Sequence, residues 1–128
     1  MAIIWISHNL GLVAGVVDTV LVMYSGFIME QAPVDDLYER PLHPYTLGLL
    51  HSVPQLDARN QDRLASIEGM PPDLRKPIAG CPFAARCPYR MEKCDLETPP
   101  LFEVDEKRKS ACWRWEEIRK ISNFGEPL

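Results

Sequence analysis

The chain opens with short apolar runs that predict β-strands. Residues 2–6 (Ala-Ile-Ile-Trp-Ile) are apolar at every position, which is typical of a buried strand in a parallel sheet. Residues 19–24 and 27–31 are rich in β-branched and other apolar residues and are joined through Ser25-Gly26. Two such runs across a two-residue turn predict a β-hairpin.

Three helices are predicted around this hairpin. The first covers residues 10–17, because its apolar side chains recur on one helical face and Ser7 or Asn9 can cap its start. The second covers residues 33–39, which begin with proline and carry acidic residues in the first turn. The third runs over residues 43–53 and ends before a proline.

The histidines of the chain lie at the ends of these elements. We expect His43 and His51 to have capping or packing roles. His8 lies where the predicted first strand ends and a helix begins, which is where ligands bind in open α/β sheets. Taken alone, a histidine at this place is more often a cap or a surface residue, so its role depends on the surrounding sequence.

The second half of the chain holds all four cysteines, with the spacing C-x5-C-x6-C-x17-C from Cys81 through Cys87 and Cys94 to Cys112. Seven of the 12 prolines fall between residues 71 and 100. Because proline removes a backbone donor and restricts the residue before it, this region can form only short helical turns. Something other than regular secondary structure must order it, and a site shared by the four thiols is the candidate.

The spacing leaves three assignments of the thiols open. Two disulfides would suit a secreted domain, but no export leader is recognisable, so we expect reduced cysteines. Structural zinc usually takes its ligands from C-x2-4-C turns, which are absent. An iron–sulfur cluster tolerates wider spacing, and proline directly after Cys81 and Cys87 is typical of ferredoxin-like runs. We expect Trp113, Trp115 and Ile118 to cover such a site.

Composition narrows the possible functions. The chain has 128 residues, 46% hydrophobic residues and a net charge of -4, which is typical of one globular domain. No apolar run approaches the roughly 20 residues of a membrane span. The acidic balance gives no reason to expect a nucleic-acid partner. We interpret the basic run at residues 107–109 as a solvated loop.

Residues 6–14 (Ile-Ser-His-Asn-Leu-Gly-Leu-Val-Ala), followed by residues 18–33, resemble the last part of the ATPase domain of ABC transporters. In that family a histidine contacts the γ-phosphate of ATP, and the resemblance implies this catalytic and cofactor-binding role for His8 alone. Asn9 stands where the family usually has aspartate, and Phe27 where it more often has a basic residue. Neither change removes the group that contacts phosphate.

The remaining motifs resemble the C-terminal extension of oligopeptide and dipeptide import ATPases. They are residues 40–46 with His-Pro-Tyr, residues 67–72, residues 80–94 and Cys112. The resemblance implies a 4Fe-4S cluster bound by Cys81, Cys87, Cys94 and Cys112, and zinc stays the alternative metal that the spacing left open. It also implies that the full subunit uses ATP and Mg as cofactors. The implied partners are transmembrane permease subunits and a second ATPase subunit, and the implied location is the cytoplasmic face of the membrane.

The sequence contains no G-x-x-x-x-G-K-[ST] phosphate loop, no Leu-Ser-Gly-Gly-Gln signature and no strand that ends in Asp-Glu. We therefore expect an inactive C-terminal fragment of an ATPase, which self-associates through its unpaired first strand. The alternative is an independent cysteine-metal module with a redox or interaction role. The predicted fold is an α/β fragment: the end of an ATPase core (1–32), linking helices (33–54), an irregular proline-rich cysteine-metal domain (55–120) and a tail (121–128).

Overall fold

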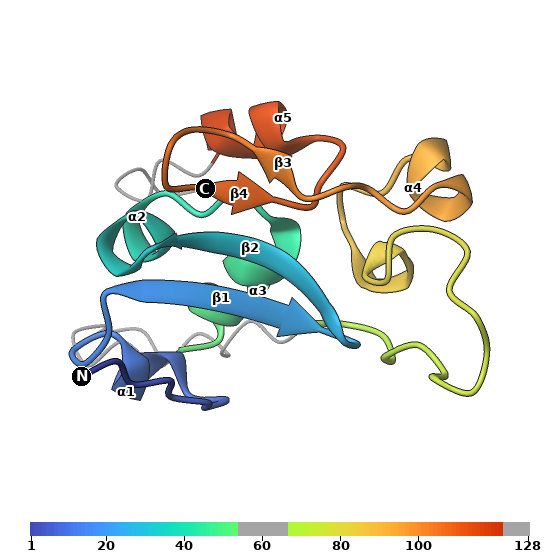
Figure 1. The fold of residues 1–128 in the computed structure, drawn as a ribbon. Coiled ribbons are helices and arrows are strands. Elements are labelled where there is room, and N and C mark those ends of the chain that lie inside the picture. The colour runs from blue at the N-terminus through green and yellow to red at the C-terminus, as the bar shows by residue number, and fades with distance from the viewer. Residues whose placement is uncertain (54–66, 122–128) are drawn as a thin grey trace, which may run out of the picture.

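The computed structural model describes residues 1–53 and 67–121 as a small α/β structure around a four-stranded antiparallel sheet (Figure 1). The strands are ordered β1-β2-β4-β3. They are β1 (Thr19–Tyr24), β2 (Phe27–Pro33), β3 (Phe102–Glu103) and β4 (Lys109–Ser110). The helices are α1 (Leu10–Val13), α2 (Val34–Glu39), α3 (Pro44–His51), α4 (Glu92–Leu96) and α5 (Trp115–Ile121), with a 3-10 turn η1 (Ala84–Arg86).

The hairpin predicted at residues 19–31 is confirmed. Its strands are antiparallel, and β2 continues two residues beyond the predicted end, to Pro33. Ser25 and Gly26 turn the chain with positive φ angles of 51° and 85°, as a type I′ turn requires. Side chains of β1 alternate between exposed and buried, so one face of the hairpin packs against the interior.

The buried parallel strand predicted at residues 2–6 is wrong. These residues form no strand, and their side chains are exposed, with Ile4 at 92% and Ile6 at 93% of full exposure. A strand that is apolar on both faces needs a neighbour for its backbone and a layer on each side. Within the described residues, β1 pairs only with β2, so nothing supplies these partners.

The predicted helices form with changed lengths. The one expected at residues 10–17 is only the four-residue α1, which Asn9 caps by accepting hydrogen bonds from two backbone amides of the first turn. The helices expected at residues 33–39 and 43–53 are confirmed as α2 and α3. His43 Nδ1 accepts a hydrogen bond from the Tyr45 amide at 3.0 Å, which confirms its capping role. None of the helices in the described ranges is long and apolar enough to span a bilayer.

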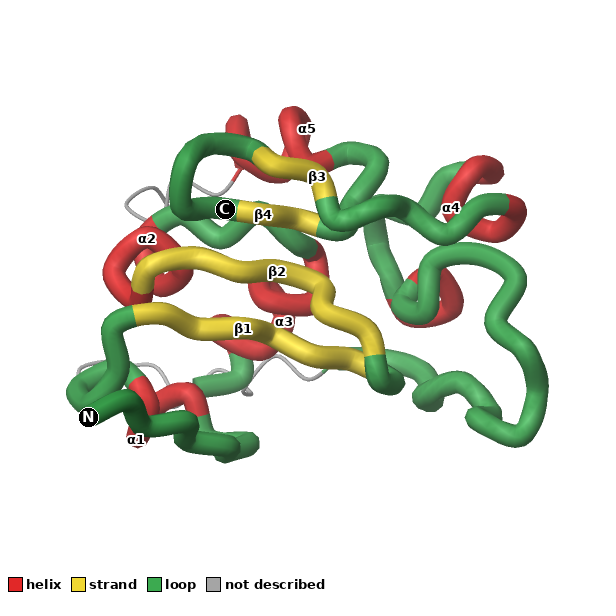
Figure 2. The backbone as a smooth tube through the Cα atoms, in the orientation of Figure 1, coloured by secondary structure: helices red, strands yellow, loops and turns green. Residues whose placement is uncertain are grey.

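The hairpin and the cysteine-rich extension share one sheet. β4 pairs with β2, placing Ser110 opposite Glu30, and the Ala111 amide donates to the Met29 carbonyl at 2.8 Å. α3 lies behind the hairpin in Figure 1, on the side of the buried β1 residues. Figure 2 shows that most of residues 67–91 form loops and turns, as the prolines predicted. The predicted tail and the start of the cysteine-rich segment fall largely on residues 122–128 and 54–66, outside the described residues.

A polar cluster is buried where β2, α3 and β4 meet. Glu30 is fully buried, and its Oε1 accepts a hydrogen bond from the Leu42 amide at 2.7 Å. Arg108 Nη2 lies 3.9 Å from the same oxygen. Arg108 is buried rather than solvated, so the interpretation of residues 107–109 as a solvated loop is wrong. Burial outweighs these contacts and raises the pKa of Glu30 to about 7.

This cluster generates a pH prediction. The Glu30 pKa rises from 4.5 when unfolded to about 7 when folded, so Glu30 stabilises the fold below pH 4.5 and loses this contribution as the pH rises through 7. The loss is about 3 kcal/mol. Burial lowers the pKa of His43 from 6.5 to about 3, which gives the opposite slope between pH 4.5 and 6.5.

In the wild type, the pH dependences of stability that Glu30 and His43 cause nearly cancel between pH 4.5 and 6.5. In Glu30→Gln only the His43 slope remains, so the free energy of unfolding should rise with pH between 4.5 and 6.5. Urea unfolding of both proteins at half-unit pH steps measures the difference. Parallel profiles for the two proteins would show that the pKa of Glu30 does not change on folding.

Candidate metal centre

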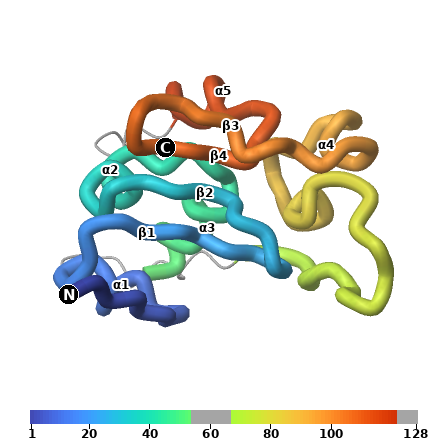
Figure 3. The backbone as a smooth tube through the Cα atoms, in the orientation of Figure 1, coloured from blue at the N-terminus to red at the C-terminus, as the bar shows by residue number. Residues whose placement is uncertain are grey.

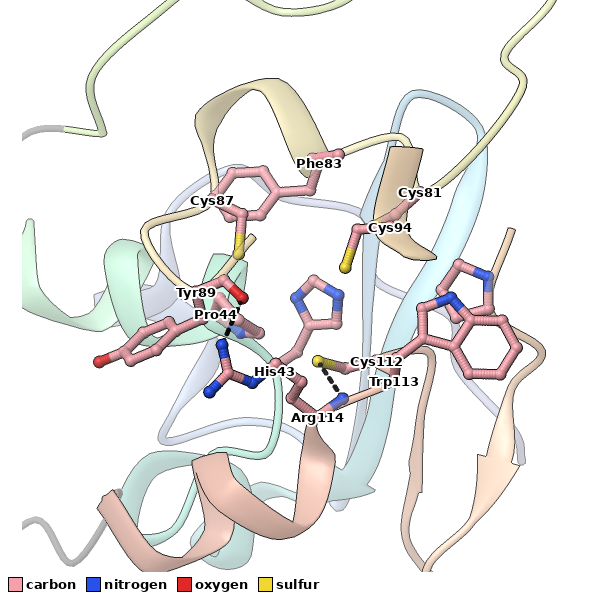
Figure 4. Close-up of a pocket in the computed structure, with 12 residues that line it drawn as sticks. His43, Pro44, Cys81, Phe83, Cys87, Tyr89, Cys94, Cys112, Trp113 and Arg114 are labelled. Atoms are coloured by element: carbon pink, nitrogen blue, oxygen red, sulfur yellow. Dashed lines mark hydrogen bonds between the residues drawn. The ribbon is translucent and has the colours of Figure 1, made fainter. Parts of the chain in front are cut away.

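The four predicted ligands line one pocket. Cys81, Cys87, Cys94 and Cys112 surround it together with the His43 ring and other side chains. All four cysteines are free thiols, so the two disulfides that the spacing left open as an alternative are not formed in the structure. In Figure 4 the sulfur atoms of Cys87, Cys94 and Cys112 face a common space beside the His43 ring.

A close backbone contact places Cys81 beside Cys94. The Cys81 amide donates to the Cys94 carbonyl at 2.7 Å. Gly80 permits this approach, because a Cβ at that position would lie 2.2 Å from the same carbonyl oxygen. The Thr98 hydroxyl donates to the Gly80 carbonyl at 3.0 Å and fixes the other side of the turn. The segment before Cys81 therefore lies directly on α4.

The turn that carries Cys87 is anchored by its neighbours. Phe83 is buried and packs edge-on against Tyr24 with ring centroids 5.4 Å apart. Arg86 donates to the Ile67 carbonyl at 3.1 Å and to the Tyr24 hydroxyl at 3.3 Å. These contacts attach η1 to the end of β1, so the hairpin sets the position of Cys87.

Cys112 enters the pocket directly after β4. The Arg114 amide donates to Cys112 Sγ at 3.4 Å. Trp113 covers the edge of the pocket, because its Nε1 donates to the Glu97 carbonyl at 3.0 Å and the Lys93 ammonium lies 3.9 Å from its ring centroid. Of the three residues predicted to cover the site, Trp113 lines the pocket, whereas Trp115 and Ile118 do not.

The pocket disfavours thiolates that have no positive partner. Burial raises the pKa of Cys81, and it raises that of Cys87 to about 11 and that of Cys112 to about 12. Neighbouring thiols raise these pKa values further by mutual repulsion. Backbone amides act in the opposite direction. For each of these cysteines one such amide lies two residues later, on Phe83, Tyr89 or Arg114.

The donor set fits a thiolate-bound metal, because a cation would offset the cost of burying four thiolates. The geometry does not present a finished site. Within residues 1–53 and 67–121, no three Cys, His, Asp or Glu side chains are grouped closely enough to hold a metal ion. The cavity between the thiols measures about 10 Å³, roughly the room of one water molecule. The metal therefore stays a prediction.

His8 lies elsewhere. It belongs to the exposed N-terminal segment and does not line the thiol pocket. In Figure 3 this segment and α1 lie at the opposite end of the sheet from α4. The structure therefore brings the four cysteines together but not His8 with them.

Sequence reasoning missed Gly80, Arg86 and Arg114 at this site. Arg86 directly precedes a cysteine, and Arg114 follows one by two residues. The second spacing was a usable signal, because Phe83 and Tyr89 have the same offset from their cysteines. Gly80 gave a weaker signal, since the close approach to α4 depends on a pairing that is distant in sequence.

Known proteins resemble this chain over most of its length. The model of the family described as "Oligopeptide/dipeptide transporter, C-terminal region" matches residues 29–94. A probable peptide ABC transporter ATP-binding protein of Sinorhizobium fredii is 46% identical over 117 residues, which cover 91% of this chain and 35% of that protein. The oligopeptide transport ATP-binding protein OppD of Escherichia coli and the dipeptide transport ATP-binding protein DppD of Bacillus subtilis are each 48% identical over 113 residues, 88% of this chain and 33% of theirs. The chain thus spans about a third of the length of these relatives.

The contact at Gly80 yields a test of the pocket. In Gly80→Ala the new methyl group would collide with backbone atoms of α4, so the free energy of unfolding should fall by about 1–3 kcal/mol. Gly15→Ala is the matched control, because a Cβ at Gly15 meets nothing within 4 Å. Urea unfolding followed by tryptophan fluorescence compares them. Equal stability of the two variants would contradict the contact between Gly80 and α4.

Proposed function

Because the chain belongs to the family of oligopeptide/dipeptide transporter C-terminal regions, we propose that it forms the C-terminal part of the ATP-binding subunit of an ABC importer for peptides. One observation supports this most strongly. The family match over residues 29–94 coincides with 46–48% identity, over about nine-tenths of the chain, to ATP-binding proteins of peptide transporters.

In this proposal the parent subunit hydrolyses ATP with Mg, and His8 contacts the γ-phosphate. The 128 residues lack a phosphate loop, whose amides and lysine provide most phosphate contacts in such enzymes. The exposed place of His8 supports the proposal, since a histidine that contacts a nucleotide must be accessible to it. Permease subunits and a second ATPase subunit are the proposed partners, at the cytoplasmic face of the membrane.

The exposed apolar residues 3–6 bear on whether the isolated chain self-associates. In the parent subunit they lie against the rest of the ATPase domain. In the isolated chain they are exposed, as are Leu21 and Met23 on the outer face of β1. Apolar patches of this kind associate, so we propose that the isolated chain self-associates.

We further propose that the four cysteines hold a metal, with a 4Fe-4S cluster as the first candidate and zinc as the second. A shared apolar pocket, four free thiols and backbone amides directed at three of them support this. Such a cluster supplies one-electron redox capacity when it is bound. The residues of the chain orient the thiols and exclude water, with Trp113 and Phe83 as apolar cover.

The ATPase proposal predicts different results for the chain and its parent. The isolated chain should release no phosphate from ATP above a His8→Ala control. In the full-length parent subunit, His8→Ala should lower turnover on the order of a hundredfold, because one contact to the transferred phosphate is lost. Phosphate release assays measure both. Unchanged turnover in the full-length variant, with its fold intact by circular dichroism, would remove His8 from the mechanism.

The metal proposal predicts a colour. Protein purified without oxygen should be brown and should bleach on reduction if the thiols hold an iron–sulfur cluster. Zinc would give a colourless protein with about one metal per chain, because its d shell is filled. Cys94→Ser should release the metal in either case, while Gly15→Ala should retain it. If elemental analysis finds neither iron nor zinc in protein purified without oxygen, the metal site is refuted.

A further inference from the structure

Arg114 differs from the other residues that follow the cysteines. Phe83, Tyr89 and Arg114 each lie two residues after a cysteine. Phe83 and Tyr89 have no charged group, whereas Arg114 carries a guanidinium. Only the contact of the Arg114 amide joins a thiol to the start of α5, at 3.4 Å from Cys112 Sγ.

The Arg114 side chain reaches from this position to a second thiol segment. Its Nη1 donates to the Tyr89 carbonyl at 2.9 Å (Figure 4). Tyr89 lies two residues after Cys87. The guanidinium is held from the other side by Glu117 of α5, which accepts from its Nε at 2.9 Å. One residue therefore contacts the segments of Cys87 and Cys112, which are 25 positions apart in the chain.

We propose that Arg114 is a positioning residue that holds the Cys87 and Cys112 segments at a fixed spacing around the metal. This inference rests on the metal site proposed above. Neither segment has a long backbone ladder of its own, because Cys87 follows a single 3-10 turn and Cys112 follows a two-residue strand. A side chain that joins them therefore determines whether their thiols keep a common geometry.

The charge of Arg114 acts in the same direction. Four thiolates around a divalent ion or a doubly charged cluster leave a net charge of about -2. The Arg114 guanidinium, whose Nη1 donates to the carbonyl of Tyr89 two residues after Cys87, places a positive charge beside this negative site. A lysine would keep this charge, but it lacks the planar fork that contacts Tyr89 and Glu117 at once. Charge and positioning can thus be separated by substitution.

The test uses zinc as the probe, loaded under anaerobic conditions into the wild type, Arg114→Gln, Arg114→Lys and the control Arg75→Gln. Arg75 pairs with Asp73 on the surface, so the control loses the same charge and one exposed ion pair, and Arg75 does not line the thiol pocket. Transfer of zinc to a coloured chelator gives the release rate. Hydrogen exchange of the metal-free proteins reports the order of residues 87–91 and 112–117.

Arg114→Gln should release zinc about tenfold faster than the wild type, as is usual when a residue that orients metal ligands is lost. Arg114→Lys should also release it faster, and Arg75→Gln should not. Exchange in both segments should rise about fivefold in Arg114→Gln, the factor expected for one hydrogen bond.

Release from Arg114→Gln at the rate of Arg75→Gln would overturn the role of Arg114 and leave the metal site intact. Wild-type rates in Arg114→Lys would overturn positioning in favour of charge alone. A wild type that takes up neither zinc nor iron would overturn the metal site itself. In that case the hydrogen exchange of the metal-free proteins decides whether Arg114 holds the two segments together. Unchanged exchange in Arg114→Gln would refute this role, and faster exchange would support it.

Discussion

The pairing of β2 with β4 is the contact on which the rest of the structure depends. Only two residue pairs form it, Glu30 with Ser110 and Gln31 with Lys109. It nevertheless joins segments almost 80 positions apart and places Cys112 beside the His43 ring. Without it, side-chain contacts such as those of Phe83 and Arg86 with Tyr24 would have to attach the cysteine-rich extension to the hairpin. The order of the thiol pocket is thus a consequence of this short ladder.

A ladder of two pairs is weak alone, and buried side chains reinforce it. The Ser110 hydroxyl donates to the Leu42 carbonyl at 2.9 Å, and Arg108 donates to the Arg40 carbonyl. Glu30 accepts from the Leu42 amide. This arrangement fixes β2, β4 and the start of α3 to one another, but it buries two charged groups. The raised pKa of Glu30 and the lowered pKa of Arg108 both result from that burial.

Local patterns predicted the hairpin and two helices because their causes are local. Ser25-Gly26 sets the turn, and His43 with Pro44 starts α3. The strand expected at residues 2–6 failed because burial needs partners that local composition does not reveal. β3 and β4 have only two residues each, so no periodicity can reveal them.

The sequence predicted which thiols line the candidate site, but it did not predict the residues that hold them in place. Cysteine spacing and the prolines indicated that the four thiols act together, and they do line one pocket. The residues that hold them depend on tertiary contacts. Arg86 reaches the hydroxyl of Tyr24, and Arg114 reaches a carbonyl in another segment. Long polar side chains of this kind look like ordinary surface residues in a sequence, because their partners are distant in the chain.

The hairpin also links the thiol pocket to the region of His8. Arg86 joins the pocket to Tyr24 at one end of β1, and the Tyr38 hydroxyl donates to the Leu10 carbonyl of α1 near its other end. Coupling between two sites requires an element with two discrete arrangements. The hairpin has a tight turn and a ladder whose register shifts between Val22 and Met23. A metal at the cysteines would stabilise the extension, and any influence on His8 would have to pass through this hairpin.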